Sequence, residues 1–290
     1  MCENAAKIVL ISLKSKTIQQ RQKSLIFYIR ATQSVKNQEI SCNFVPNITK
    51  IRMKKLHVIT PVKNSVGTAL QTIESVCTSH VTMKFQYTVY DDFSDEETVN
   101  ALLRAREKYD FELTLLSSLT QHPSPNYLLV LQHAQQKALE EDAHLVIVES
   151  DVVVQPDTLQ TMQQRAHLLP KIALLGAVTT DETENFNFPY LYARNYPYGI
   201  IKTPRRISFC CTLISNDFLS RYDFRLLNRG KTWFDVTLSR KAVKAGMYNY
   251  LLTDTPVLHY PHSSRPWKNL KKTNPLLYYW QKFVLRRERI

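Results

Sequence analysis

The sequence predicts an α/β fold with a mostly parallel central sheet and helices on both faces. From about residue 55 onward, apolar runs alternate with segments of helical periodicity, which is typical of repeated β-α-β units. The apolar runs are largely continuous, as in parallel strands that are buried on both faces. The chain has 290 residues, of which 44% are hydrophobic, and this is enough to bury one sizeable core.

The first part of the pattern predicts a regular series of elements. Strands are expected at residues 56–60, 85–90, 111–116 and 144–148, and helices at 66–79, 94–109, 127–141 and 157–169. Ser94 is predicted to cap its helix, because Glu97 follows three residues later as in a capping box. Pro156 stands near the start of the 157–169 helix, where proline is favoured.

The second part of the pattern is less regular. Loops are predicted at 177–206, strands at 207–215 and 250–258, and helices at 233–245 and 276–288. Gly246 follows the 233–245 helix and is expected to end it. The helix at 276–288 is basic and aromatic.

Positive charge is concentrated at the two ends of the chain. The net charge is +13, of which residues 1–52 carry +7 and residues 265–290 carry +7, so that residues 53–264 carry −1. A near-neutral body is not typical of a nucleic-acid-binding domain, and no nucleic-acid partner is expected. Basic ends with aromatic residues fit an anionic membrane surface. The alternative is a solvated tail.

Three segments are expected along the chain. Residues 1–52 lack a strand–helix rhythm and are predicted to be a poorly ordered N-terminal extension. Either the start is over-extended and Met53 is the natural first residue, or the segment is a regulatory or anchoring arm. Residues 53–262 are expected to form the α/β domain, and residues 263–290 a basic aromatic C-terminal helix.

Composition also bears on location. No apolar run reaches the roughly 18 residues of a membrane-spanning helix, and the apolar stretch at 8–13 is short for a secretory signal. The five cysteines are odd in number and lack metal-ligand spacing, so we interpret them as reduced thiols. A cytoplasmic location is therefore expected, with peripheral attachment to the inner face of the membrane as a further possibility.

Polar residues follow three of the predicted strands. These groups are residues 60–64 (TPVKN), Asp91-Asp92, and Glu149-Ser150-Asp151. Ligands of open parallel sheets bind beyond the carboxyl ends of the strands, so three such groups indicate one site at a common edge. Each group alone is also explained by turn formation.

Glu149 and Asp151 indicate a metal site. Alternate residues of an extended chain point the same way, so the two carboxylates share a side. Two like charges so close are costly unless a cation neutralises them. Oxygen ligands favour Mg²⁺ or Mn²⁺, which complete their shells with water and phosphate oxygens. Because the sequence has no glycine-rich phosphate loop, the metal is expected to neutralise a diphosphate.

These motifs resemble those of family 2 glycosyltransferases, which are inverting enzymes with a GT-A type, Rossmann-like sandwich fold. The matching segments are 59–64 (ITPVKN), 90–98 (YDDFSDEET), 148–152 (VESDV) with 156–159 (PDTL), and 233–238 (WFDVTL) with Ala245-Gly246. The resemblance covers about residues 55–262, and the order and spacing of the four motifs make it fairly specific.

For the donor nucleotide, the resemblance implies a pocket at the ends of the first two strands. Thr60, Pro61 and Val62 would line the nucleobase pocket. Asp91 or Asp92 would bind the base, with Asp92 preferred. A nucleotide-sugar donor is the partner that this pocket implies.

For catalysis, the resemblance implies a metal ion and a base. Asp151 would be the principal metal ligand, with Glu149 near the ribose or the metal. Asp235 would be the general base that deprotonates the acceptor hydroxyl. His259 or His262 would complete the metal shell, although a histidine near a strand end is also a common structural hydrogen-bonding residue.

The sequence departs from the family pattern at several positions. Glu149 replaces the usual first aspartate of the metal motif, Phe234 replaces a glutamate, and Phe93 replaces a glycine, which predicts a less tight turn there. The processive Gln-X-X-Arg-Trp signature is absent, which favours addition of a single sugar. The aromatic segment 186–198 is expected either to cover the acceptor or to pack a loop.

The expected function is metal-dependent, inverting transfer of one sugar from a nucleotide-diphosphate sugar to a glycan or lipid-linked hydroxyl acceptor, in cell-surface glycan synthesis. The alternatives are a nucleotidyltransferase of related topology and a non-catalytic sugar-nucleotide-binding protein. A basic nucleic-acid binder is a further alternative, whose affinity would fall steeply with salt.

Overall fold

The computed structural model describes residues 53–230, 233–260 and 273–284, with side chains up to residue 280 in the last range. The expectations for residues 1–52 and for His262 lie outside these ranges. The described part holds a nine-stranded mixed sheet in the order β3-β2-β1-β4-β8-β6-β9-β5, with β7 paired to β9.

The first half of the sheet is parallel. It consists of β1 (Lys55–Val62), β2 (Gln86–Asp91), β3 (Glu112–Leu115) and β4 (Ala143–Val148). The rest is mixed and consists of β5 (Val152–Val153), β6 (Ile172–Thr180), β7 (Ile200–Thr203), β8 (Cys211–Ile214) and β9 (Tyr248–His259). In this half, β6 and β9 pair in parallel, whereas β5, β7 and β8 run antiparallel to their neighbours.

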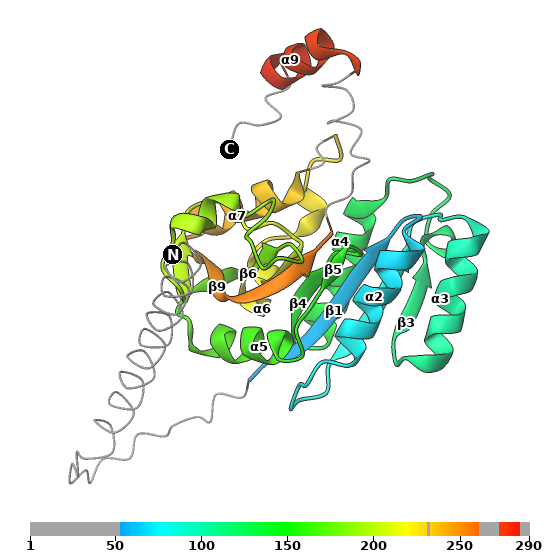
Figure 1. Ribbon diagram of the computed structural model, residues 1–290, viewed down its shortest axis with the longest axis horizontal. Coiled ribbons are helices and arrows are strands. Elements are labelled where there is room, and N and C mark those ends of the chain that lie inside the picture. Colours follow the sequence, from blue (N-terminus) through cyan, green and yellow to red (C-terminus); the bar gives the residue numbers. More distant parts are fainter. Residues whose placement is uncertain (1–52, 231–232, 261–272, 285–290) are drawn as a thin grey trace, which may run out of the picture. The chain divides into compact units, whose positions relative to one another are not determined.

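Helices cover both faces of the sheet (Figure 1). On one face lie α2 (Val66–Cys77), α3 (Glu96–Lys108) and α5 (Thr158–Leu168), and on the other α4 (Tyr127–Glu140), α6 (Asn216–Arg221) and α7 (Phe234–Lys244). The apolar side chains of each group pack into a separate buried cluster. The expected α/β fold is therefore confirmed.

Most elements of the first part are confirmed to within two residues, but the start of α3 differs. Its cap is Asp95, whose carboxylate accepts a hydrogen bond from the Thr98 amide at 2.9 Å. The prediction that Ser94 is the cap is wrong. The Ser94 hydroxyl instead accepts a hydrogen bond from the Asn64 amide at 3.0 Å, and this links the end of β2 to the end of β1.

The prediction of loops throughout 177–206 is also wrong. Residues 177–180 complete β6, all nine residues of which are buried, and residues 200–203 form β7. The strand predicted at 207–215 is confirmed only over residues 211–214. Two short 3₁₀ helices, η2 (Leu191–Asn195) and η3 (Phe224–Leu226), lie in the connecting segments.

Gly176 in the middle of β6 allows a close approach of the chain. A Cβ atom at this position would lie 2.6 Å from Ile207 Cγ2 and 2.9 Å from the Tyr190 hydroxyl. That hydroxyl accepts a hydrogen bond from the Ser208 amide at 2.8 Å. The absence of a side chain at Gly176 therefore lets the aromatic segment pack directly onto the sheet.

The aromatic segment mainly packs within the fold. Tyr190 is fully buried, and Tyr192 meets both Tyr190 and Tyr196 in edge-to-face contacts. Tyr198, in contrast, is 85% exposed, so it is the tyrosine of this segment that is open to a ligand.

The end of α7 matches the sequence pattern. Gly246 has a φ of +72°, which a glycine adopts without strain as it terminates a helix. The final described helix, α9 (Pro275–Val284), exposes Leu276, Tyr279 and Trp280. Among the described residues, no helix has the length and apolar character required to cross a membrane.

Candidate active site

A pocket of about 270 Å³ lies where β1 and β4 end. It is lined by Pro61, Val62, Lys63, Asp92, Tyr127, Val130, Glu149, Ser150 and Asp151. The fold thus brings together residues that the sequence placed at three separate strand ends. Thr60 is not among the lining residues, because its side chain is buried and accepts a hydrogen bond from the Tyr87 hydroxyl at 2.8 Å.

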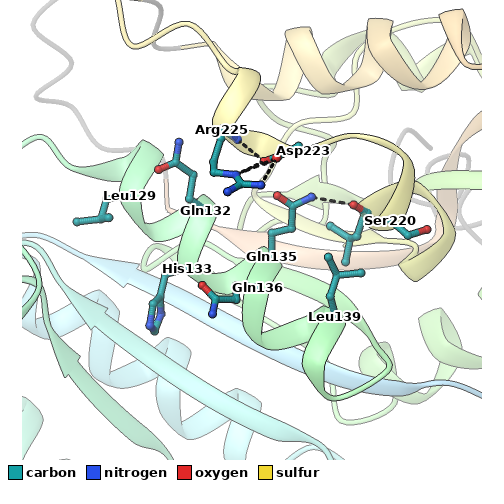
Figure 2. Close-up of a pocket in the computed structure, with 10 residues that line it drawn as sticks. Leu129, Gln132, His133, Gln135, Gln136, Leu139, Ser220, Asp223 and Arg225 are labelled. Carbon is teal, nitrogen blue, oxygen red and sulfur yellow. Dashed lines mark hydrogen bonds and ion pairs between the residues drawn. The ribbon is translucent and has the colours of Figure 1, made fainter.

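A larger cavity of about 670 Å³ lies between α4 and the α6–η3 segment (Figure 2). Its one arginine, Arg225, is neutralised by Asp223, with Nη2 and Oδ2 2.6 Å apart. Gln135 donates hydrogen bonds to the carbonyl oxygens of Leu219 and Tyr222. This cavity shares no lining residue with the pocket at the strand ends, and none of the predicted site residues lines it.

The turn after β2 is tight despite the absence of glycine. Phe93 has a φ of +55°, the left-handed conformation that glycine usually supplies. The prediction of a less tight turn at Phe93 is therefore wrong. Neighbouring contacts hold the strained residue in place, because Lys63 donates to the Phe93 carbonyl and Asn64 accepts from the Asp95 amide. A non-glycine residue in this conformation costs about 1–3 kcal/mol.

Asp92 fastens the loop that precedes α4. Its Oδ2 accepts hydrogen bonds from the Ser124 hydroxyl and the Asn126 amide, both at 2.8 Å, and its Oδ1 accepts from Asn126 Nδ2 at 2.8 Å. Both oxygens are thus engaged by the protein, although Asp92 still lines the pocket. Asp91 is also buried, and its Oδ2 accepts from the Ser94 amide at 3.3 Å.

Asp151 and His259 form a buried pair beside the pocket. Oδ2 of Asp151 lies 3.4 Å from Nε2 of His259, and both side chains are almost fully buried. The pair is assembled by β5 and β9, because Val152 is in register with His259 and the Tyr260 amide donates to the Asp151 carbonyl.

The second nitrogen of His259 fixes how the ring faces Asp151. Nδ1 lies 2.8 Å from the Phe188 carbonyl oxygen, which accepts hydrogen bonds only, so Nδ1 carries a proton. In the neutral ring, Nε2 then presents its lone pair to the Asp151 carboxylate. A cation between the two groups, either a proton on Nε2 or a metal ion, would be favoured by both lone pairs.

Glu149 reaches the same cluster through Cys210. Sγ of Cys210 lies 3.7 Å from Oε2 of Glu149 and 3.9 Å from Nε2 of His259. Glu149 is also held by its backbone, which donates to the Cys210 carbonyl at 2.9 Å. Across the described ranges, no group of three or more histidine, cysteine or acidic side chains surrounds a metal-sized space.

Asp235 lies in the first turn of α7 and is not its cap. The capping position is Trp233, which makes no side-chain capping hydrogen bond. Oδ1 of Asp235 accepts from the Val236 amide at 2.8 Å, and Oδ2 lies 3.8 Å from Nη1 of Arg206. The positive end of the helix and the guanidinium both favour the ionised carboxylate.

Tyr127 lines the pocket at the strand ends and also contacts the start of α7. Its ring stacks against Phe209 and Phe234, the residue before Asp235. Burial, followed by the charges of Glu149 and Asp235, raises the pKa of Tyr127 well above its ordinary value. The phenol therefore stays protonated.

Comparison with known protein families decides the identity. The profile of glycosyl transferase family 2 matches residues 57–219, more than half of the chain. This chain belongs to glycosyl transferase family 2. The predicted resemblance and the predicted transferase activity are therefore confirmed. Asp235 and His259 lie beyond the matched residues. A comparison with curated proteins finds no match.

Solved structures place the family 2 domain among GT-A glycosyltransferases. The mannosyltransferase PcManGT from Pyrobaculum calidifontis, in complex with GDP-Man and Mn²⁺, aligns with a TM-score of 0.55 at 16% identity, over 90% of this chain and 71% of that one. S. aureus TarS 1–349, in complex with UDP-GlcNAc, aligns with a TM-score of 0.56 at 16% identity, over 73% of this chain and 60% of that one. This likeness confirms the expected GT-A type fold.

Several residues near the site were not among the predicted site residues, and four of them have polar groups at or beside the pocket that come from other segments or motifs. Lys63 and Tyr127 line the pocket, and Arg206 and Cys210 contact Asp235 and Glu149. Lys63 belongs to the polar segment 60–64 that follows the first predicted strand, so its position in the sequence could have identified it as a pocket residue. The other three lie far along the chain from their partners, and no local pattern identifies them.

Proposed function

We propose that this family 2 glycosyltransferase moves a single sugar from a nucleotide-diphosphate sugar to a hydroxyl of a glycan or lipid-linked acceptor, with inversion at the anomeric carbon and dependence on a divalent metal. One observation carries the proposal. The end of β1, through Pro61 and Val62, shares a pocket with Glu149 and Asp151, which is the arrangement needed to hold a nucleoside and its diphosphate together.

The residues present fit a divalent metal. Asp151 Oδ2 and His259 Nε2 face one another at 3.4 Å, and the Phe188 carbonyl orients the ring as a partner of a metal-ligating histidine does. Mg²⁺ or Mn²⁺ needs only one or two protein ligands when diphosphate oxygens and water supply the others. Glu149 would lie next to this pair, near the metal or the ribose. When bound, the metal would stabilise the negative charge of the leaving diphosphate.

Asp235 is the proposed general base. It accepts the proton of the acceptor hydroxyl while that oxygen forms a bond to the anomeric carbon and the bond from this carbon to the diphosphate oxygen breaks. The products are the glycosylated acceptor and a nucleoside diphosphate, and one displacement inverts the anomeric configuration. Arg206 at 3.8 Å keeps the carboxylate oriented and ionised before the acceptor arrives.

We further propose roles for the nucleotide side of the pocket and for the cellular setting. Pro61, Val62 and the backbone at Thr60 would flank the nucleobase, with Asp91 or Asp92 binding it. The reaction would serve cell-surface glycan synthesis in the cytoplasm, with α9 resting on the anionic inner face of the membrane. The exposed apolar side chains of α9 and the +7 charge of residues 265–290 support this attachment.

A donor screen tests the proposed function. The purified protein is incubated with a panel of nucleotide sugars with Mn²⁺, with Mg²⁺ and with EDTA, and release of nucleoside diphosphate is measured. Metal-dependent release from one or a few donors is expected. Turnover of nucleoside triphosphates would favour a nucleotidyltransferase, and donor binding without release or transfer would favour a non-catalytic binding protein.

A further inference from the structure

The ring of Tyr127 is held rigidly at the edge of the pocket. It stacks with Phe209 and with Phe234, with ring centroids 6.4 Å and 6.3 Å away and interplanar angles of 22° and 7°. These two aromatic contacts restrict the side chain of Tyr127, and the position of its hydroxyl is restricted with it. Because Tyr127 is the first residue of α4 and lines the pocket, its side chain belongs to the site.

The hydroxyl of Tyr127 makes no hydrogen bond within the described part of the fold. It is buried to less than 1 Å² of exposed area, and among the described residues none is placed to hydrogen-bond with it. A buried hydroxyl without a partner is destabilising, and phenylalanine would supply the same stacking without that cost. The stacked ring therefore explains an aromatic residue here, but it does not explain a tyrosine.

The residues around Tyr127 indicate which part of the donor its hydroxyl would contact. Glu149 and Asp151, on the proposed donor side, line the same pocket as Tyr127. Asp235, on the proposed acceptor side, follows Phe234, whose ring stacks with that of Tyr127. In a single displacement, the transferred sugar lies between the leaving diphosphate and the base. A phenol is protonated at neutral pH, so it is available as a hydrogen-bond donor.

We propose that the Tyr127 hydroxyl donates a hydrogen bond to an oxygen of the transferred sugar and so helps to select and position that sugar. This assignment rests on the proposed transfer function. A polar group that is buried for one hydroxyl of a ligand discriminates strongly against ligands that lack it. Tyr127 would thus act on the sugar, while the nucleoside and the diphosphate are held by other residues.

Tyr127→Phe isolates the hydroxyl because the stacked ring remains. Calorimetry with Mn²⁺ measures the affinity of the preferred nucleotide sugar and of the matching nucleoside diphosphate, for the wild type and the variant. We expect the nucleotide sugar to bind about tenfold or more weakly to the variant, with unchanged affinity for the nucleoside diphosphate and a melting temperature at least as high. Tyr250→Phe is the matched control, since it removes a tyrosine hydroxyl on β9 that donates a hydrogen bond to the Pro170 carbonyl. The affinities of this control for both ligands should equal those of the wild type.

The outcomes separate this assignment from the proposed function. If the wild type binds a nucleotide sugar and Tyr127→Phe binds it equally well, the hydroxyl is satisfied by water or by a carboxylate and the assignment is overturned alone. If the variant loses affinity equally for both ligands, the hydroxyl contacts the diphosphate and the assignment to the sugar is overturned. A wild type that binds no nucleotide sugar overturns the proposed function and this assignment together.

Discussion

Arg206 and Asp235 form an ion pair at the start of α7, with Nη1 and Oδ2 3.8 Å apart. The side chain of Asp235 is 15% exposed and that of Arg206 is 27% exposed, so both are partly accessible to solvent. The pair joins the first turn of α7 to the segment before β8. The guanidinium favours the charged form of the carboxylate, which the proposed role of Asp235 as a base requires.

Replacing Asp235 with asparagine should abolish proton acceptance, and it also removes the charge that faces Arg206. Asparagine keeps the shape of the side chain and its contact with the Val236 amide, so we expect transfer to fall by about 10²–10⁴ while donor affinity is unchanged. Transfer rate and donor affinity are measured in parallel. Asp217→Asn in the first turn of α6 is the control and should be silent. Near-normal transfer by Asp235→Asn would mean that another group is the base.

Replacing Asp151 with alanine should remove the metal-dependent part of diphosphate binding. The variant leaves His259 without the carboxylate that faces it, so affinity in Mn²⁺ should fall to the value measured in EDTA. Calorimetry with the nucleoside diphosphate measures both values. Asp157→Ala, which removes an exposed carboxylate before α5, should behave as the wild type. Unchanged metal dependence in Asp151→Ala would reject the ligand assignment.

Gly176→Ala should destabilise the fold. The added Cβ would stand 2.6 Å from Ile207 and 2.9 Å from the Tyr190 hydroxyl, and overpacking of this kind costs about 1–3 kcal/mol. Urea unfolding measures the change. Gly67→Ala in α2 is the matched control, because nothing lies within 4 Å of its added Cβ. The control should be neutral or stabilising by up to about 1 kcal/mol. Equal stability of the two variants would contradict the close approach.

His144 should make the protein less stable in mild acid. Burial lowers its pKa from 6.5 to about 4, and its Nδ1 accepts a hydrogen bond from the Asn216 amide at 3.0 Å. The unfolded chain binds a proton on this ring near pH 6.5, whereas the folded protein does not. Its contribution to stability is therefore complete above pH 6.5, is lost as the pH falls, and stops changing below about pH 4.

His144→Gln tests this dependence because glutamine retains an acceptor but does not titrate. The free energy of unfolding is measured by urea at several pH values between 4 and 7. One titrating group changes the free energy of unfolding by up to about 1.4 kcal/mol per pH unit. The slope of this free energy against pH should therefore be smaller in His144→Gln than in the wild type. His167→Gln, at an exposed position, should leave the slope unchanged. An identical slope in all three proteins would show that His144 is not the titrating group.

The helix α9 should bind anionic membranes. Leu276 is 85% exposed and Trp280 is 59% exposed, and each basic residue near the surface adds about 1 kcal/mol. Flotation with anionic and neutral vesicles should recover the protein with anionic vesicles only. Leu276→Asp should weaken recovery, whereas Leu226→Asp, which alters a leucine that is 71% exposed in η3, should not. Recovery that is equal with both vesicle types, or absent, would reject the attachment.

The first half of the fold was predictable because its signals are local. Each strand up to β4 is a short apolar run between helices, and the polar residues at 91–92 and 149–151 follow directly from where those strands end. β6 was missed although it is a continuous buried strand, because no helical segment follows it to mark its end. The capping residue was shifted by one because Ser94 is engaged by Asn64, a contact across 30 residues.

The site was predictable only in part, because some of its contacts are local and others join segments that are distant in the sequence. The carboxylates of Glu149 and Asp151 are close in sequence, and their common side follows from strand geometry. The pairing of Asp151 with His259 and that of Asp235 with Arg206 join distant segments, so that only the family resemblance pointed to His259 and nothing pointed to Arg206. The left-handed Phe93 runs against local preference, and it is held by contacts from Lys63 and by the turn at Asn64.

The place of β9 in the sheet has a consequence for synthesis on the ribosome. Although β9 follows all the other strands along the chain, it pairs with β6, β7 and β5 and brings His259 to Asp151. A nascent polypeptide that lacks β9 leaves the edge of β6 unpaired, which is a known route to aggregation. It also leaves Asp151 without its histidine. β9 thus closes the sheet and completes the Asp151–His259 pair in the same step. A nascent chain therefore acquires the pair only when it also acquires the strand that covers the edge of β6.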